Sequence, residues 1–180
     1  RAQSAMEFYT NFLTVHKTWS PDLATDLEAF YSGNLAMMLA PSWRAFDVIN
    51  SAPEIEFGIA PVPQLPGNNP VNYSMYWGEA VAATSEHPQE AWEFIEWLSQ
   101  PAQQQEMFSN SSQIRAFGEP YSRESITSEL TDHQYVAAFI EMAPTMRAWK
   151  MGEQSVIEES IRTAINDVAE GGEDIDSALS

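Results

Sequence analysis

The spacing of apolar residues changes between the two halves of the chain, and this feature constrains the fold more than any other. In the first half, stripes with the period of a helix alternate with short apolar runs, LAMMLA at 35–40 and IEFGIAPVP at 55–63. Short apolar runs between turn residues are typical of buried strands. In the second half the helical period dominates. The alternation predicts a helix-rich α/β or α+β layer architecture with short strands.

Caps and helix breakers set the bounds of the predicted elements. We expect helices over 2–15, 21–31, 42–50, 88–99, 101–109, 132–143 and about 155–170, and a short last helix. We expect strands over 35–39, 57–61 and 77–84, the first two as neighbours in one sheet. Asp132 is predicted to cap its helix, and Ser155 and Glu158 are predicted to form a capping box. Trp92 belongs to a broad apolar helix face and is expected in a core.

Acidic residues greatly outnumber basic ones. Asp and Glu number 26 and Lys and Arg 8, which gives a net charge of −18. A surface of this sign repels phosphate backbones, so no nucleic acid is expected as a partner. Two explanations of the charge stay open. It serves solubility, or it belongs to a protein that works in salty water, where counter-ions screen the self-repulsion.

Several classes of chemistry find no support in the sequence. Cysteine is absent, and His16, His87 and His133 lack the spacing of a metal site. The P-loop and the H-E-x-x-H motif are absent as well. The apolar run at 35–40 is far shorter than the roughly 20 residues of a membrane helix. We therefore expect no cofactor, no metal and no catalytic residue, although Glu79 leaves a glycoside-active enzyme open.

Aromatic residues gather in loops and at the starts of elements, where a core does not need them. They are Trp43, Tyr73, Tyr76, Trp77, Tyr121 and Trp149. A flat ring covers the apolar face of a sugar well, while carboxylates, amides and Arg bind the hydroxyl groups at its rim. Core packing is the alternative explanation for each ring taken singly.

Four segments, in this order, resemble the extracellular solute-binding proteins of ABC importers, in the carbohydrate-type group that includes maltose-binding protein. DLEAFYSGNLAMMLAPSWRAF is similar to the family pattern F..G.aAM...g.W, and EFGIAPVPQLPGNNP is similar to fgvaPlP...G..p. YWGEAVAATSEHPQEAWEFIEWLSQPAQQQEMF resembles gG.g.ai...s.np..A..Fi.fl.spe.Q, and SIRTAINDVAEGGEDIDSAL resembles al..al..v..g.....eAl. The similarity spans nearly the whole chain, and four loose motifs in one order are specific.

The resemblance implies a periplasmic-binding-protein-like two-lobed fold of type II, with a mixed α/β sheet in each lobe and the ligand between the lobes. It implies that residues 1–76 are part of the second lobe. Residues 77–112 then cross the hinge and supply helices of the first lobe, and residues 113–180 return to the second lobe with the C-terminal helices. The chain starts at Arg1 without an initiator Met. We expect it to be the C-terminal portion of a longer protein, whose other half holds most of the first lobe and the export signal.

The resemblance also implies a function without chemistry. A sugar or oligosaccharide is captured in the cleft and delivered to the transmembrane subunits of an ABC permease. The protein is then periplasmic or extracellular and reaches the membrane through the transporter. The ligand contacts implied by the resemblance are Trp43, Tyr76, Trp77, Gly78 and Arg115. Two further expected contacts are Glu79, which follows Trp77 and Gly78, and Trp149, whose loop PTMRAWKMGEQ departs from the family patterns.

Three alternatives remain open on the sequence. In the first alternative, the ligand is a solute other than a sugar, such as a polyol, a polyamine or an opine-like compound. In the second, the protein is a glycoside-active enzyme that uses Glu79. In the third, the chain is a helical interaction module whose aromatic side chains are all buried.

Overall fold

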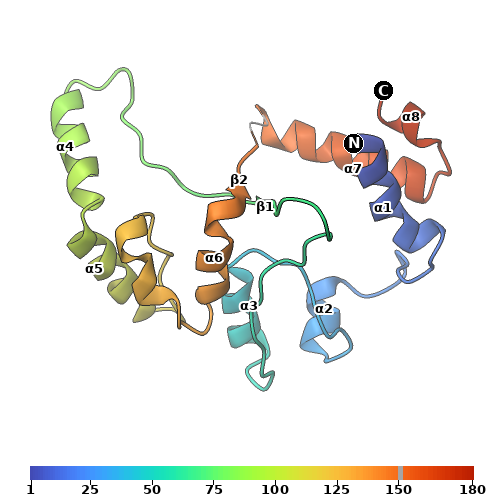
Figure 1. Ribbon diagram of the computed structural model, residues 1–180, viewed down its shortest axis with the longest axis horizontal. Coiled ribbons are helices and arrows are strands. Elements are labelled where there is room, and N and C mark those ends of the chain that lie inside the picture. Colours follow the sequence, from blue (N-terminus) through green and yellow to red (C-terminus); the bar gives the residue numbers. More distant parts are fainter. Residues whose placement is uncertain (150–151) are drawn as a thin grey trace. The chain divides into compact units, whose positions relative to one another are not determined.

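The computed structural model describes residues 1–149 and 152–180, and helices dominate it (Figure 1). The α-helices are α1 (Ala2–Thr14), α2 (Asp26–Tyr31), α3 (Arg44–Ser51), α4 (Pro88–Leu98), α5 (Pro101–Ser112), α6 (Ala137–Met142), α7 (Gln154–Ala169) and α8 (Ile175–Ala178). Two 3-10 helices, Glu124–Leu130 and Ala143–Thr145, and two strands, β1 (Asn72–Tyr73) and β2 (Met146–Arg147), complete the described elements. Within the described ranges, no helix combines the length and the apolar character that a membrane crossing requires.

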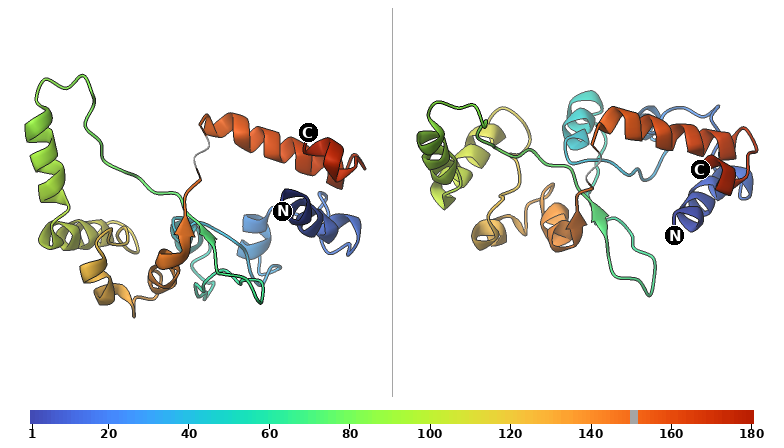
Figure 2. Two further views of the ribbon diagram at one scale, coloured as in Figure 1. Left: turned by 45° about the horizontal axis from the view of Figure 1, so that its top comes forward. Right: turned by 90° about the horizontal axis from the view of Figure 1, so that it is seen from above.

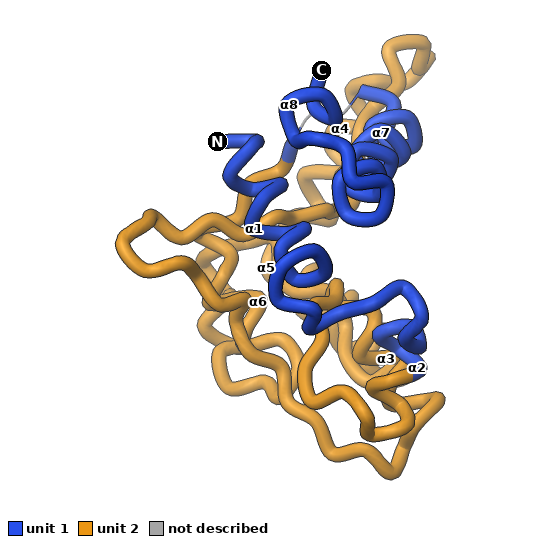
Figure 3. Tube along the Cα trace, turned by 90° about the vertical axis from the view of Figure 1, so that its right-hand side faces the viewer, with its two compact units in different colours: residues 1–28, 149–180 blue, residues 29–148 orange. Residues whose placement is uncertain are grey.

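The described chain divides into two compact units (Figure 3). Unit 1 consists of residues 1–28 and 149–180, and unit 2 consists of residues 29–148. Unit 1 therefore joins two segments that are far apart in sequence, whereas unit 2 is continuous.

Unit 1 is a cluster of three helices in which α1 lies beside α7 and α8 (Figure 2). Met6 of α1 and Val168 of α7 are buried. The side-chain amide of Gln3 in α1 also donates a hydrogen bond to the carboxylate of Asp176 in α8. The end of α7 agrees with the prediction, because Gly172 has a φ of 72°, a left-handed conformation that closes a helix and suits glycine.

The core of unit 2 forms around Phe117, which is 2% exposed. Its buried neighbours are Ala45, Leu130 and Val136. Aromatic rings surround it, with the centroid of Phe46 at 4.4 Å and that of Tyr135 at 5.6 Å. Such ring pairs add to the free energy gained from burial alone. This core holds α3, the 3-10 helix at Glu124–Leu130 and the start of α6 together.

The strand prediction was wrong at all three places. Residues 35–39, 57–61 and 77–84 belong to no strand, and β1 and β2 form a parallel pair with Asn72 opposite Met146 and Tyr73 opposite Arg147. A strand needs a neighbour for its N–H and C=O groups. At 57–61 the apolar side chains pack against the core while the backbone has no partner strand among the described residues. At 35–39 even the side chains are exposed, Met37 at 83% and Leu39 at 74%.

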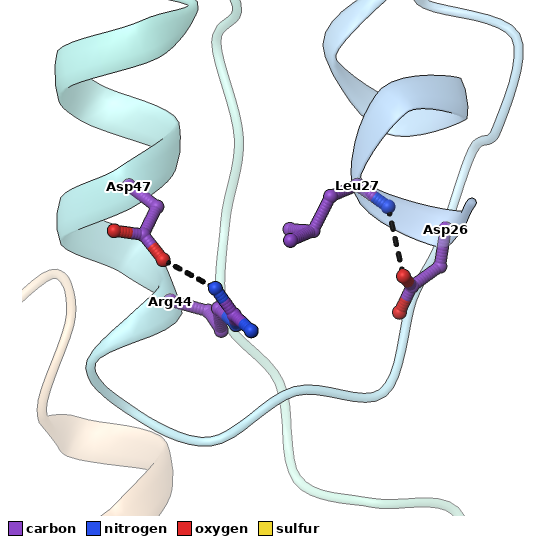
Figure 4. A network of polar contacts seen from close by, with 4 residues as sticks. All are labelled: Asp26, Leu27, Arg44 and Asp47. Atoms are coloured by element: carbon purple, nitrogen blue, oxygen red, sulfur yellow. Dashed lines mark hydrogen bonds and ion pairs between the residues drawn. The ribbon is translucent and has the colours of Figure 1, made fainter.

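The predicted helix at 21–31 begins five residues later, at Asp26. A capping box at Thr25 sets this start. The Thr25 N–H donates to the Glu28 carboxylate at 3.2 Å, and the Glu28 N–H donates to the Thr25 hydroxyl at 3.3 Å. The two bonds satisfy backbone donors that the first turn leaves without partners. The Leu27 N–H is bonded at 2.9 Å to the carboxylate of Asp26 (Figure 4).

Two other predicted caps were also wrong. Residues 132–135 form turns, and α6 starts only at Ala137, with no side-chain cap. At α7 the hydroxyl of Ser155 bonds to the Glu153 carboxylate at 3.0 Å instead of closing a box with Glu158. At α7 the competing bond to Glu153 takes up the Ser155 hydroxyl that the capping box requires.

Helix α4 agrees with its predicted bounds but not with its predicted burial. Trp92 is 55% exposed, so its placement in a core was wrong, and no residue of α4 is buried. The ring of Phe94 stacks on Trp97 with centroids 5.8 Å apart, and both rings remain half exposed. The apolar face of α4 therefore lacks a partner within the described residues of the chain.

Candidate functional site

The aromatic segment, residues 73–77, begins at the end of β1. Tyr73 is 55% exposed, Tyr76 78% and Trp77 100%. Burying a tryptophan or tyrosine ring is favourable, so three rings left in solvent within five residues are unusual in a structure with an aromatic core. Within the described residues, none of these three rings is packed in a core. Each exposed ring offers a flat apolar face, which is the kind of surface that a sugar ring stacks on.

One backbone hydrogen bond fixes the start of this segment. The Ser74 N–H donates to the carbonyl oxygen of Arg147 at 3.2 Å, which extends the parallel pairing of β1 and β2 by one step. Farther along the chain, the next backbone hydrogen bond within the described residues is the one that the Ser85 N–H donates to the Ala82 carbonyl oxygen, in a turn. In the part of the chain that the structure describes, the N–H and C=O groups of residues 76–81 form no backbone hydrogen bond.

Gly78 and Glu79 follow directly on the exposed rings. Among the described residues other than its two chain neighbours, no atom lies within 4 Å of the position that a Cβ of Gly78 would occupy, so no close approach there requires glycine. Glu79 is exposed, and its carboxylate takes part in no ion pair or hydrogen bond in the described part of the chain. An exposed carboxylate next to Trp77 is equipped to bind hydroxyl groups or a cation.

Trp43 stands at the start of α3, as its sequence pattern predicts. It is the N-cap residue, and its side chain is 46% exposed. The first turn of α3 is held by an ion pair of 2.8 Å between Arg44 and Asp47 (Figure 4). Asp47 also complements the positive end of the helix dipole. The ring of Trp43 is thus attached to a well-fixed helix start.

Arg115 lies close to the same helix. Its guanidinium carbon is 5.1 Å from the centroid of the Phe46 ring, and Phe46 follows Trp43 by three residues on α3. Its Nη2 is paired with the Glu119 carboxylate at 2.8 Å. The fold therefore brings Arg115 to Phe46 in the first turn of α3, although Arg115 and Phe46 are remote in sequence.

Trp149 is 57% exposed and belongs to unit 1, whereas the other predicted contacts belong to unit 2.

Tyr121 is different from the remaining loop aromatics. It is half-buried, and its ring packs at 5.4 Å from Phe108 in the shell of the core. Burial, followed by the negative charge of Glu129, raises the pKa of the Tyr121 hydroxyl. Tyr121 is therefore a core residue.

Sequence reasoning missed Asn72. Its side chain is buried, and its amide is hydrogen-bonded at both ends. In sequence it resembles the loop residues Asn68 and Asn69 close by, and no signal in the pattern separates a buried amide from exposed ones.

A hollow in unit 2 contains none of the predicted contacts. It has a volume of about 460 Å³ and is lined by Ile49, Pro53, Ile55, Glu56, Phe57, Gln134 and Tyr135. Within the described residues, no group of three or more His, Asp or Glu side chains is placed to hold a metal ion.

Comparison with known proteins identifies the class of this chain. The model of the family described as bacterial extracellular solute-binding protein matches residues 6–105, which is more than half of the chain. Trp43 and the segment from Tyr76 to Glu79 lie inside the match, and Arg115 and Trp149 lie outside it. A comparison with curated proteins finds no significant match.

Family membership supports a substrate-binding role in an ABC importer, with a small-molecule solute and a permease as the class of partners. It also confirms that the chain is not an enzyme, because the family binds solutes without converting them, and this removes the glycoside-active alternative. A helix-rich chain with a small parallel sheet fits part of such a protein. The chain belongs to the bacterial extracellular solute-binding protein family.

Proposed function

We propose that this chain contributes to capturing a sugar or oligosaccharide for delivery to the transmembrane subunits of an ABC permease. The observation that carries the proposal is the exposure of Tyr76 and Trp77, at 78% and 100%, in the segment that follows β1. The apolar face of a sugar ring stacks on such a surface, and truncation of a stacked aromatic at an interface is typically costly in affinity. Release to the permease takes place outside the cytoplasmic membrane, in the periplasm or extracellular space.

The proposed contacts have distinct roles. Trp43 and Trp77 supply the stacking surfaces, and Tyr76 adds a ring with a hydroxyl group. Gly78 leaves the backbone open to the ligand, and Glu79 accepts hydrogen bonds from sugar hydroxyl groups. Arg115 and Trp149 extend the set, since a guanidinium donates to hydroxyl oxygens and an indole stacks.

We place these contacts in a two-lobed fold of type II. In it, residues 1–76 supply part of the second lobe, residues 77–112 cross the hinge and add helices to the first lobe, and residues 113–180 return to the second lobe. The half-exposed apolar face of α4 supports this placement, because a helix with no buried residue requires cover from elsewhere.

A second candidate ligand is a cationic solute such as a polyamine. The observation that favours it is the exposed Glu79 carboxylate beside the exposed Trp77 ring, because a cation is attracted both to a carboxylate and to the face of an indole.

Titration calorimetry of the full-length protein with a panel of neutral sugars, polyols and linear polyamines tests the proposal. Binding of a neutral sugar is the expected result. Binding of polyamines alone selects the second candidate. Failure of every neutral sugar and polyamine to bind contradicts both.

A further inference from the structure

The strand that leads into the aromatic segment is too short to hold itself in place. β1 has two residues and one parallel neighbour. An isolated pair of strands is at best marginally stable in water, even when it is much longer. The position of residues 73–77 therefore depends on contacts made by side chains around β1.

Asn72 makes those contacts. Its side chain is 7% exposed, so an unpaired amide here would carry a large desolvation cost. Its Nδ2 donates to the hydroxyl oxygen of Thr145 at 2.7 Å, and its Oδ1 accepts from Nε2 of Gln64 at 3.2 Å. Both ends of the amide are thus satisfied by residues from two other parts of unit 2.

The bonds beyond Asn72 fix the direction of this network. The hydroxyl of Thr145 donates to the carbonyl oxygen of Met142 at 2.8 Å, so its proton is committed and its oxygen accepts from Asn72. Gln64 also donates to the Val62 carbonyl oxygen at 3.0 Å and accepts from the Val71 N–H at 3.0 Å. Because each group has a fixed role as donor or acceptor, the Asn72 amide is satisfied in one orientation.

The network sets the register of β1. It ties residues 62–64 and 142–145 to Asn72 and so holds Asn72 opposite Met146. A slip by one residue would turn every side chain of the strand to the opposite face. The rings that follow would then leave the sheet in another direction.

We propose that Asn72 is a positioning residue, which fixes the aromatic segment through its hydrogen bonds to Gln64 and Thr145. The effect of Asn72 on affinity rests on the proposed function, because the placement of the aromatic rings matters for binding only if they contact the solute. The placement itself is measurable without any solute.

A matched pair of variants separates the hydroxyl from the bulk of Thr145. Thr145→Val removes the acceptor of the Asn72 amide and keeps a similar shape, whereas Thr145→Ser keeps the hydroxyl. Thr10→Val is the control for a general loss of stability, since Thr10 is buried in unit 1 and donates its own hydroxyl bond to Met6 at 2.9 Å. The chain has no cysteine, so spin labels attach only to cysteines that are introduced.

The labels are placed at Tyr76→Cys in the segment and Glu141→Cys on the exposed side of α6, and pulsed electron resonance measures the distribution of distances between them. We expect a distribution at least twice as broad in Thr145→Val as in the otherwise unchanged protein. Thr145→Ser and Thr10→Val are expected to leave its width unchanged. An unchanged width in Thr145→Val, or equal broadening in Thr10→Val, overturns the proposal.

Affinity is measured on the same substitutions without labels, using the neutral sugar that binds most tightly in the calorimetric panel. We expect a loss of about tenfold in Thr145→Val, the order of one lost hydrogen bond, and little change in the other two variants. Broadening without a loss of affinity overturns the positioning role. If no sugar binds the unchanged protein, the proposed function fails, and the distance distributions still decide whether the network holds the segment.

Discussion

The guanidinium of Arg115 lies over the ring of Phe46, with its central carbon 5.1 Å from the ring centroid. The same guanidinium pairs with Glu119 at 2.8 Å. Arg115 thus joins the loop after α5 to the helix that Trp43 begins.

Replacing Arg115 should therefore affect stability even without a ligand. A cation–π contact at a partly exposed site contributes about 0.5–1 kcal/mol and a surface ion pair at most about 1 kcal/mol. We expect Arg115→Ala to lower the free energy of unfolding by about 1 kcal/mol in urea denaturation. Glu119→Gln, which removes the ion pair alone, is the control and should cost less. Equal effects of the two variants would show that the ring contact contributes nothing.

Trp77→Ala should reduce affinity and leave stability unchanged. The side chain is 100% exposed, so its loss opens no cavity, whereas truncating an aromatic hot spot costs about 2–4 kcal/mol in binding. The affinity for the sugar selected in the panel should fall roughly thirtyfold or more. Trp77→Phe keeps a flat ring and should cost much less. A lower Tm with unchanged affinity would instead show that the ring packs in a core of the full-length protein.

The half-exposed face of α4 should make residues 1–180 prone to association when they are expressed alone. Trp92 is 55% exposed, and the stacked rings of Phe94 and Trp97 are 56% and 52% exposed. Apolar rings left in solvent favour self-association. We expect Trp92→Lys to shift size-exclusion profiles toward monomer and to reduce binding of a hydrophobic dye. Trp19→Lys is a matched control, because Trp19 is similarly exposed, at 50%, on another part of the chain. A monomeric, dye-silent unchanged protein would mean that this face needs no cover.

Stability should fall in strongly alkaline solution through Tyr121. Burial and the nearby Glu129 charge raise its pKa above the ordinary value of 10.0, so the folded state holds the proton more tightly than the unfolded state. The resulting stabilisation is fully present below pH 10 and is lost as the pH rises toward the pKa of the folded state. Urea denaturation between pH 9 and 11 should show a steeper loss for the unchanged protein than for Tyr121→Phe. Parallel pH profiles would exclude this contribution.

Salt should raise the Tm, because a net charge of −18 destabilises the compact state by self-repulsion and counter-ions screen it. Thermal unfolding in NaCl from 0.05 to 1 M measures the effect. A Tm that stays constant over this range would contradict the interpretation that the chain is adapted to salty water.

The helices were predictable where the signal is local. The prolines at the starts of α4 and α5 and the glycines after α7 act within one turn, and these bounds agree with the structure. The strands were not predictable, because strand pairing depends on residues that are remote in sequence. β1 is the dipeptide Asn72–Tyr73, and its partner lies at Met146–Arg147. No apolar run marks either segment.

The candidate site was predictable to a similar degree. The sequence pattern selected aromatic residues in loops as exposed rings, and Tyr76 and Trp77 are exposed. The same reasoning also selected Tyr121, which is half-buried. It also missed Asn72, because burial of an amide follows from its hydrogen-bond partners Gln64 and Thr145 and not from its own type.

The packing of α1 against α7 and α8 has a consequence for biosynthesis. A ribosome makes α1 well before α7 and α8, so α1 leaves the exit tunnel before these two helices exist. Unit 2 lies wholly between them in sequence and is free to fold during that interval. Until α7 and α8 emerge, α1 lacks the helices beside which it lies in unit 1, and this stage of synthesis is where a chaperone would be most useful.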